Sequence, residues 1–164
     1  MTVTGRPVPQ GALLQRYVGQ GSTYVDCYGV EVAGAVSLSQ FVMAFYTTRL
    51  FRLERVVLSL ALRRRINDLD IADMLSGATG QFAVWTVEGR GPDELLLRDG
   101  GGYTRSWFGV RMSGPARTQL LFGSAVVARD GAALSVVARS SLPLHKIYSR
   151  ALLQSAARDL GDSR

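Results

Sequence analysis

Cysteine, histidine and lysine are almost missing from this chain of 164 residues, which contains one of each. The single cysteine, Cys27, excludes an internal disulfide and a zinc site built from several thiolates. The single histidine, His145, excludes any catalytic scheme that needs two imidazoles. We therefore expect no metal and no cofactor, and a polar chemistry that depends on carboxylates, arginine, tyrosine and hydroxyl groups.

Long apolar runs without charge are also missing. Residues 1–20 carry glycines and prolines and no apolar stretch of signal-peptide length, so we expect an extended lead-in over residues 1–21. The most apolar stretch, residues 41–62, has Arg49, Arg52 and Glu54 near its middle, where each charge would cost about 2.5–3.5 kcal/mol in a bilayer. With one unpaired cysteine, these features predict a cytoplasmic protein.

The positive charge, formally +6, comes almost entirely from arginine, because Lys146 is the only lysine. An arginine fork suits phosphate, but it also serves as an ordinary solvated surface group. The arginines are dispersed and are not interleaved with aromatic residues, so we expect no nucleic-acid partner. The glycine-rich turn at Gly100, Gly101 and Gly102 is not followed by a helical pattern, which excludes a phosphate loop there.

The first half of the chain predicts one strand followed by helices. Residues 22–32 are rich in β-branched and aromatic residues and predict a strand. Ser37 and Gln40 have the spacing of a capping box, and apolar residues then recur at helical intervals to Ala61. That stretch is long for one helix, so we expect two helices with a break near Thr47 and Thr48. Residues 67–75 predict a short helix or turn that Gly77 ends.

The second half predicts an antiparallel meander and a final helix. Five strand-length segments are separated by glycine-containing turns: residues 81–88, 94–98, 103–112, 117–128 and 133–140. Pro143 suits the first position of the last helix, and Gly161 suits its end. One apolar face of that helix is expected to comprise Leu144, Ile147, Tyr148, Ala151, Leu152, Ser155 and Ala156.

This order of elements resembles the START-like, polyketide-cyclase-type helix-grip superfamily (SRPBCC). The segments FVMAFYTTRLFRLER at residues 41–55 and HKIYSRALL at residues 145–153 are similar to uncharacterised bacterial proteins near that superfamily. The resemblance covers residues 24–160 and implies an α+β fold in which a curved antiparallel sheet wraps around a long C-terminal helix. It also implies one START-like domain over residues 22–164, with a cavity between the sheet and that helix.

A hydrophobic or amphipathic small molecule of lipid, polyketide or aromatic type is the expected occupant of this cavity. Trp85, Trp107, Phe108 and Tyr148 are the expected lining residues, and Arg105 is expected to hold a polar end. The alternatives are that these aromatic residues form ordinary core and that the arginines point outward.

The rival hypothesis is an enzyme of the cyclase or hydratase kind that uses the same cavity. His145, Tyr148 and Asp26 are the candidates to move a proton, and Glu88 is a further acid that one strand phase would turn inward. The alternative reading makes His145 a packing residue and both acids solvated. A third hypothesis uses the arginine-rich stretch, residues 49–65, as a surface for anionic membranes or a protein partner, and a homodimer through a sheet edge or helix stays open.

Overall fold

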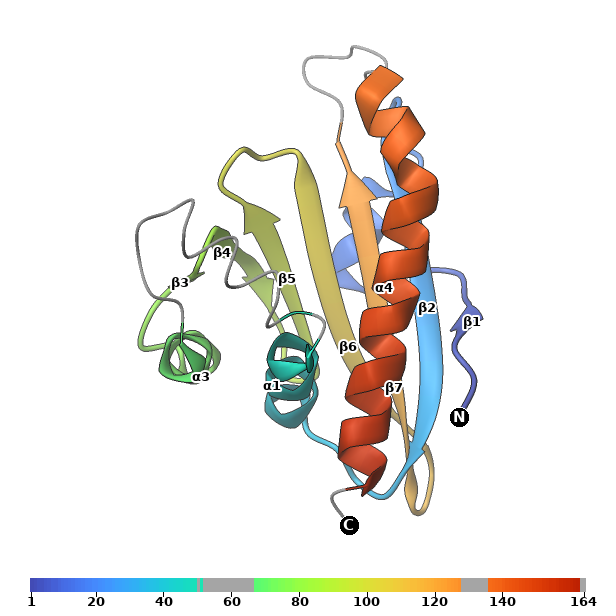
Figure 1. The fold of residues 1–164 in the computed structure, drawn as a ribbon, viewed down its shortest axis with the longest axis vertical. Helices are drawn as coiled ribbons and strands as arrows, with labels where there is room; N and C mark the ends of the chain where they lie inside the picture. The colour runs from blue at the N-terminus through green and yellow to red at the C-terminus, as the bar shows by residue number, and fades with distance from the viewer. Residues whose placement is uncertain (50, 52–66, 128–135, 163–164) are drawn as a thin grey trace.

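The computed structural model describes residues 1–49, 51, 67–127 and 136–162, with the side chains of 136–141 and 162 left aside. Within this part, three α-helices and a seven-stranded, fully antiparallel sheet form an α+β fold (Figure 1). The strands lie in the order β1-β2-β7-β6-β5-β4-β3. The elements are β1 (Thr4–Gly5), η1 (Leu13–Tyr17), β2 (Tyr24–Ala33), α1 (Leu38–Thr47), α3 (Asp68–Ser76), β3 (Gln81–Phe82), β4 (Trp85–Arg90), β5 (Glu94–Asp99), β6 (Thr104–Gly114), β7 (Arg117–Val126) and α4 (Val136–Asp162).

The first predicted strand is present as β2. It pairs with β7 along its whole length, from Tyr24 beside Val126 to Ala33 beside Arg117. Helices α1 and α4 cover one face of the sheet, which we call the inner face (Figure 1). The short helix η1 lies on the opposite, outer face.

The capping box that the sequence predicts at the start of α1 is present. Gln40 N donates to Ser37 Oγ at 3.2 Å, and Ser37 N donates to Gln40 Oε1 at 2.9 Å. The helix ends at Thr47, which confirms the predicted break. Thr48 leaves the helical conformation, and its hydroxyl accepts from the amide of Phe51 at 3.2 Å, so this side chain satisfies a backbone donor after the break. Most of the second predicted helix lies outside the described residues.

The predicted short helix before the meander is also confirmed. Helix α3 begins with a capping box between Asn67 and Asp70. It ends at Ser76, and Gly77 follows with a left-handed φ of 84° that a glycine adopts without strain.

Four of the five predicted meander segments form strands, but the fifth prediction is wrong. Residues 136–140 are the first turns of α4, and residues 133–135 lie outside the described part. The β-branched pair Val136 and Val137 favoured a strand, but such a preference is weak where packing decides. The first segment is divided between β3 and β4 at Ala83, which has a φ of 53°.

Helix α4 therefore starts earlier than the sequence predicts, and Pro143 lies inside it rather than at its first position. A proline has no amide hydrogen, so the carbonyl of Arg139, four residues earlier, loses its usual helical donor.

The buried face of α4 also differs from the predicted one. Leu144 and Ile147 are 70% and 67% exposed, and Ala151 is exposed as well. The buried residues of this helix, counted from 142 to 161, are Ser149, Leu152, Leu153, Ala156 and Ala157. Three of these five are small, which lets the helix backbone approach the sheet, whereas Leu144 and Ile147 lie outside the contact.

Each face of the sheet has its own apolar cluster. The inner cluster is rich in aromatic rings, with Phe45 stacked on Phe122 at 4.6 Å and edge-on to Phe108 at 5.0 Å. The outer cluster includes Leu14 and Trp107. Residues 1–21, expected as a lead-in, thus contribute β1 to the sheet and η1 to the outer cluster. In the described part of the chain, no helix combines the length and apolar character needed to cross a bilayer.

Candidate functional site

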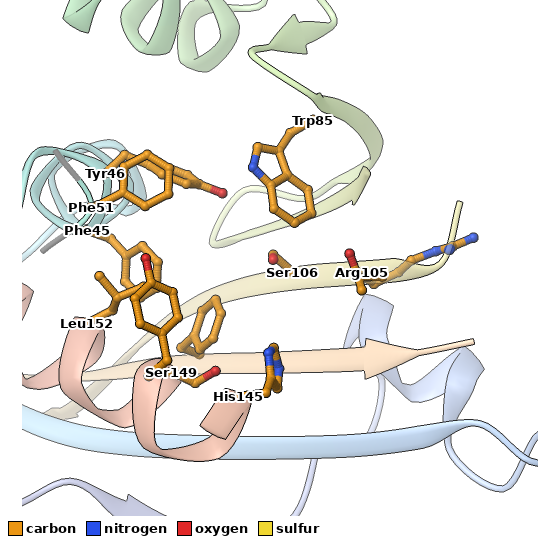
Figure 2. A pocket seen from close by; sticks show the side chains of 12 residues that line it. Phe45, Tyr46, Phe51, Trp85, Arg105, Ser106, His145, Ser149 and Leu152 are labelled. Carbon is orange, nitrogen blue, oxygen red and sulfur yellow. The ribbon is translucent and has the colours of Figure 1, made fainter. Parts of the chain in front are cut away.

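A cavity of about 300 Å³ lies between the inner face of the sheet, helix α1 and helix α4 (Figure 2). Side chains from both helices, from β4, β6 and β7 and from Phe51 enclose it. The lining comprises Phe45, Tyr46, Phe51, Trp85, Thr104, Arg105, Ser106, Phe122, His145, Tyr148, Ser149 and Leu152. Trp85, Arg105, His145 and Tyr148 are the predicted site residues among them.

The lining combines apolar rings with neutral hydrogen-bonding groups. Five hydroxyl groups border the cavity, from Tyr46, Thr104, Ser106, Tyr148 and Ser149. Among the described lining residues Arg105 is the one with a permanent charge, and Figure 2 shows its side chain extending away from the cavity. This lining suits a neutral molecule better than a carboxylate or a phosphate, whose charge would be left without a partner.

The indole nitrogen of Trp85 is the one buried side-chain polar atom without a hydrogen-bond partner in the described part of the chain. Figure 2 shows this nitrogen on the edge of the indole that faces the cavity. A buried N–H group without a partner costs about 1–3 kcal/mol. A ligand that brings an acceptor oxygen to Trp85 would remove this cost.

His145 connects the cavity to a hydrogen-bonded chain on the inner face of the sheet. Its Nε2 lies 2.8 Å from Ser124 Oγ, and that hydroxyl lies 2.5 Å from Asp26 Oδ1. Asp26 Oδ2 accepts from the hydroxyl groups of Tyr24 at 3.0 Å and Tyr28 at 3.2 Å. The side chain of Asp26 therefore lies on the inner face but does not line the cavity, and it meets His145 through one serine.

Tyr24 and Tyr28 remain protonated donors. Burial, followed by the nearby charge of Asp26, raises the pKa of Tyr28 to about 12 and raises the pKa of Tyr24 as well. Two cations of α4 lie above their rings, with Lys146 Nζ 5.2 Å from the centroid of Tyr24 and Arg150 Cζ 6.0 Å from that of Tyr28. Helix α4 is thus attached to β2 on both sides of Asp26.

Two predicted lining residues lie elsewhere, which corrects the sequence-based site. Trp107 points to the outer face, where its Nε1 donates to Glu94 Oε2 at 2.8 Å. Phe108 points to the inner face but is fully buried in the aromatic cluster and does not border the cavity. The alternation along β6 separates these neighbours, since successive side chains of a strand point to opposite faces.

Arg105 borders the cavity, but its guanidinium has protein partners outside it. Its Nε lies 2.9 Å from Glu88 Oε2 and 2.9 Å from the hydroxyl of Tyr17, and its Nη1 donates to the carbonyl of Gly102 at 2.6 Å. Tyr17 also donates to Glu88. These partners occupy the guanidinium on the outer side of the sheet. Glu88, the further acid considered above, is the ion-pair partner of Arg105 and is not a free acid at the cavity.

Ser124 could not be identified from the sequence, because its role depends on strand register. Ser124 is directly opposite Asp26 in the pairing of β2 with β7, and no local sequence pattern indicates that pairing. Phe45, Tyr46, Ser106 and Ser149 also border the cavity and were not among the predicted lining residues.

Within the described residues, no group of three or more histidine, cysteine, aspartate and glutamate side chains is arranged to hold a metal ion. A scan against protein-family models found no match for this chain, and neither did searches of curated proteins and of solved structures.

Proposed function

We propose that this protein binds a neutral hydrophobic or amphipathic small molecule in the cavity between the sheet and helix α4. The observation that carries the proposal is the buried N–H of Trp85, which faces a cavity of about 300 Å³ and has no partner in the described part of the chain. Ligand sites are mostly apolar, with a few fixed polar groups, and the smallest of them have volumes of about 300 Å³.

The arrangement of the fold supports this proposal. After β1 and η1, strand β2 is followed by α1 and α3, the meander from β3 to β7 returns to pair with β2, and α4 lies across the inner face. This is the order that the resemblance to the START-like helix-grip proteins implies, and we include membership of that superfamily in the proposal.

The size and lining of the cavity suggest a ligand of one or two rings. Phe45, Phe122 and Leu152 offer apolar contacts, and the hydroxyl of Ser106 and the indole of Trp85 offer polar ones. An eleven-atom neutral molecule such as 2-naphthol, at about 0.5 kcal/mol per atom, would bind with a Kd of roughly 0.1 mM.

The first experiment combines native mass spectrometry with extraction and small-molecule analysis of the protein purified from bacteria. A reproducible excess mass with a recovered aromatic, polyketide or lipid compound would identify the chemical class. Titration with 2-naphthol, followed by its fluorescence, then measures binding directly.

Two variants on β6 distinguish ligand binding in the cavity from binding at the surface. Ser106→Leu places an apolar side chain in the cavity and should reduce 2-naphthol affinity at least tenfold, while Ser113→Leu, on the exposed end of the same strand, should leave it unchanged. A wild-type protein that carries no compound and takes up no 2-naphthol would refute the proposal. Equal binding by both variants would place the ligand elsewhere.

A further inference from the structure

The hydrogen bonds that connect Asp26, Ser124 and His145 determine which group donates in each contact. Tyr24, Tyr28 and Ser124 all place a hydroxyl against Asp26, which is the environment of a carboxylate that only accepts. Ser124 has one hydrogen and donates it to Asp26 Oδ1. Its oxygen is then an acceptor towards His145, so the Nε2 of His145 must carry the hydrogen in their contact of 2.8 Å.

A neutral imidazole with a hydrogen on Nε2 has a lone pair on Nδ1. In the described part of the chain, Nδ1 of His145 has no hydrogen-bond partner, and the ring borders the cavity. The pair of Asp26 and Ser124 therefore holds the only histidine in the tautomer that offers a base, and the positive charge that forms on protonation lies one serine away from a carboxylate.

The opposite wall supplies a hydrogen-bond donor. Figure 2 shows Trp85 and His145 entering the cavity from different sides, one from β4 and the other from α4. A base on one wall of a cavity and a buried N–H group on another are suited to a molecule that loses a proton and places the resulting negative charge on an oxygen.

We infer that the cavity is a proton-transfer site for neutral, enolisable carbonyl compounds, with His145 as the general base and with Ser124 and Asp26 as its positioning residues. This inference rests on the proposed function, since it uses the same cavity. In the step, His145 Nδ1 takes a proton from the carbon next to the carbonyl. The electron pair of the C–H bond forms a C=C bond, and the C=O π pair moves to the oxygen, which accepts the hydrogen bond of Trp85 Nε1. Return of a proton from His145 to carbon restores the ketone and needs no further reactant.

The tautomer can be tested without a ligand. Because His145 is the only histidine, nitrogen-15 NMR of the labelled protein shows a single imidazole. We expect a protonated Nε2 and an unprotonated Nδ1 in the wild type. We expect a mixture of tautomers in Ser124→Ala, and wild-type signals in Leu144→Gln, a control on the exposed side of α4. A wild-type histidine protonated on Nδ1, or present as a mixture, would overturn the positioning role.

Proton transfer can be tested with 2-tetralone, an enolisable ketone of two rings, by NMR detection of deuterium uptake at its α-carbons in heavy water. We expect the wild type to accelerate exchange above the buffer rate. His145→Gln should lose about 10²-fold or more of this acceleration. Trp85→Phe should lose about 10²-fold in kcat, because it removes one donor to the enolate oxygen. Asp26→Asn and Ser124→Ala should lower kcat more than they change KM, together with the change in tautomer.

Each outcome separates the two proposals. Binding of 2-tetralone without catalysed exchange would overturn the proton-transfer site and leave the binding function intact. Binding of 2-naphthol but not of 2-tetralone would overturn the substrate class. Failure of both to bind would overturn the proposed function itself. Exchange that survives in His145→Gln would remove His145 from the catalytic role.

Discussion

Replacing Arg105 by alanine should destabilise the protein strongly and leave ligand binding unchanged. The guanidinium contacts Glu88, Tyr17 and the carbonyl of Gly102, and its side chain is only 11% exposed. Breaking a buried ion pair by removing one partner costs about 3–5 kcal/mol. The side chain of Glu88 is 18% exposed and has Arg16 at 3.8 Å as a second cation, which reduces the cost to about 3 kcal/mol.

Urea denaturation followed by circular dichroism measures this loss directly. For a chain of this size, about 3 kcal/mol corresponds to a decrease in Tm of roughly 6–12 °C. Arg111→Ala is the matched control, since Arg111 is exposed on the same strand and should change the free energy of unfolding by no more than about 0.5 kcal/mol.

A double variant tests the reason for the loss. Removing Glu88 together with Arg105 leaves no unpaired charge, so the double variant should lose less than the sum of the two single losses. A loss below about 1 kcal/mol in Arg105→Ala would refute the buried-pair argument. If Arg105→Ala keeps wild-type stability but no longer binds 2-naphthol, Arg105 contacts the ligand.

Three further predictions concern packing, pH and helix capping. Gly123→Ala should cost about 1–3 kcal/mol in denaturation experiments, because a Cβ there would lie 2.5 Å from Leu14 Cδ2; a wild-type midpoint would disprove the tight contact. Burial raises the pKa of the Cys27 thiol from 9.0 to about 11, so the folded state keeps a proton that the unfolded state loses, and the free energy of unfolding should fall as pH rises from 9 to 11. Cys27→Ala should flatten this decrease, and an unchanged slope would assign it to other groups. Ser37→Ala should cost about 1 kcal/mol by removing the cap of α1, whereas Gln40→Glu, which keeps an acceptor at that position, should cost less.

Local signals in the sequence predicted many of the elements. The capping pair of Ser37 and Gln40, the break at Thr48 and the stop at Gly77 each depend on neighbouring residues, and each is found in the structure. The glycine-containing turns likewise predicted the order of the strands from β3 to β7, because a short turn leaves consecutive strands few options except to pair.

Orientation was harder to predict, because both faces of the sheet are covered. On β6, Trp107 belongs to the outer cluster and its neighbour Phe108 to the inner cluster, so apolar residues occur on both faces of the strand. No pattern of burial could then say which face of the strand lies towards α4. Helix α4 presented a related problem, since Leu144 is as apolar as Leu152 and only the contact with the sheet distinguishes them.

The candidate site depended on still more distant relations. His145 and Asp26 were recognised as candidates by residue type, but Ser124, which joins them, becomes visible only when β2 is paired with β7. Trp85 was predicted to line the cavity, and its unpartnered nitrogen is a property of the folded surroundings.

The pairing of β2 with β7 also bears on the order in which contacts can form during synthesis. Strand β2 leaves the ribosome early, while β7 is synthesised only after α1, α3 and the rest of the meander. Contacts between such distant segments form late in folding, because closing the intervening chain costs entropy before the contacts repay it. Asp26 therefore has no Ser124 to pair with during most of synthesis, and His145 is synthesised later still. A nascent chain that exposes β2 offers an unpaired edge to other chains, so slow synthesis of this protein should favour aggregation over folding.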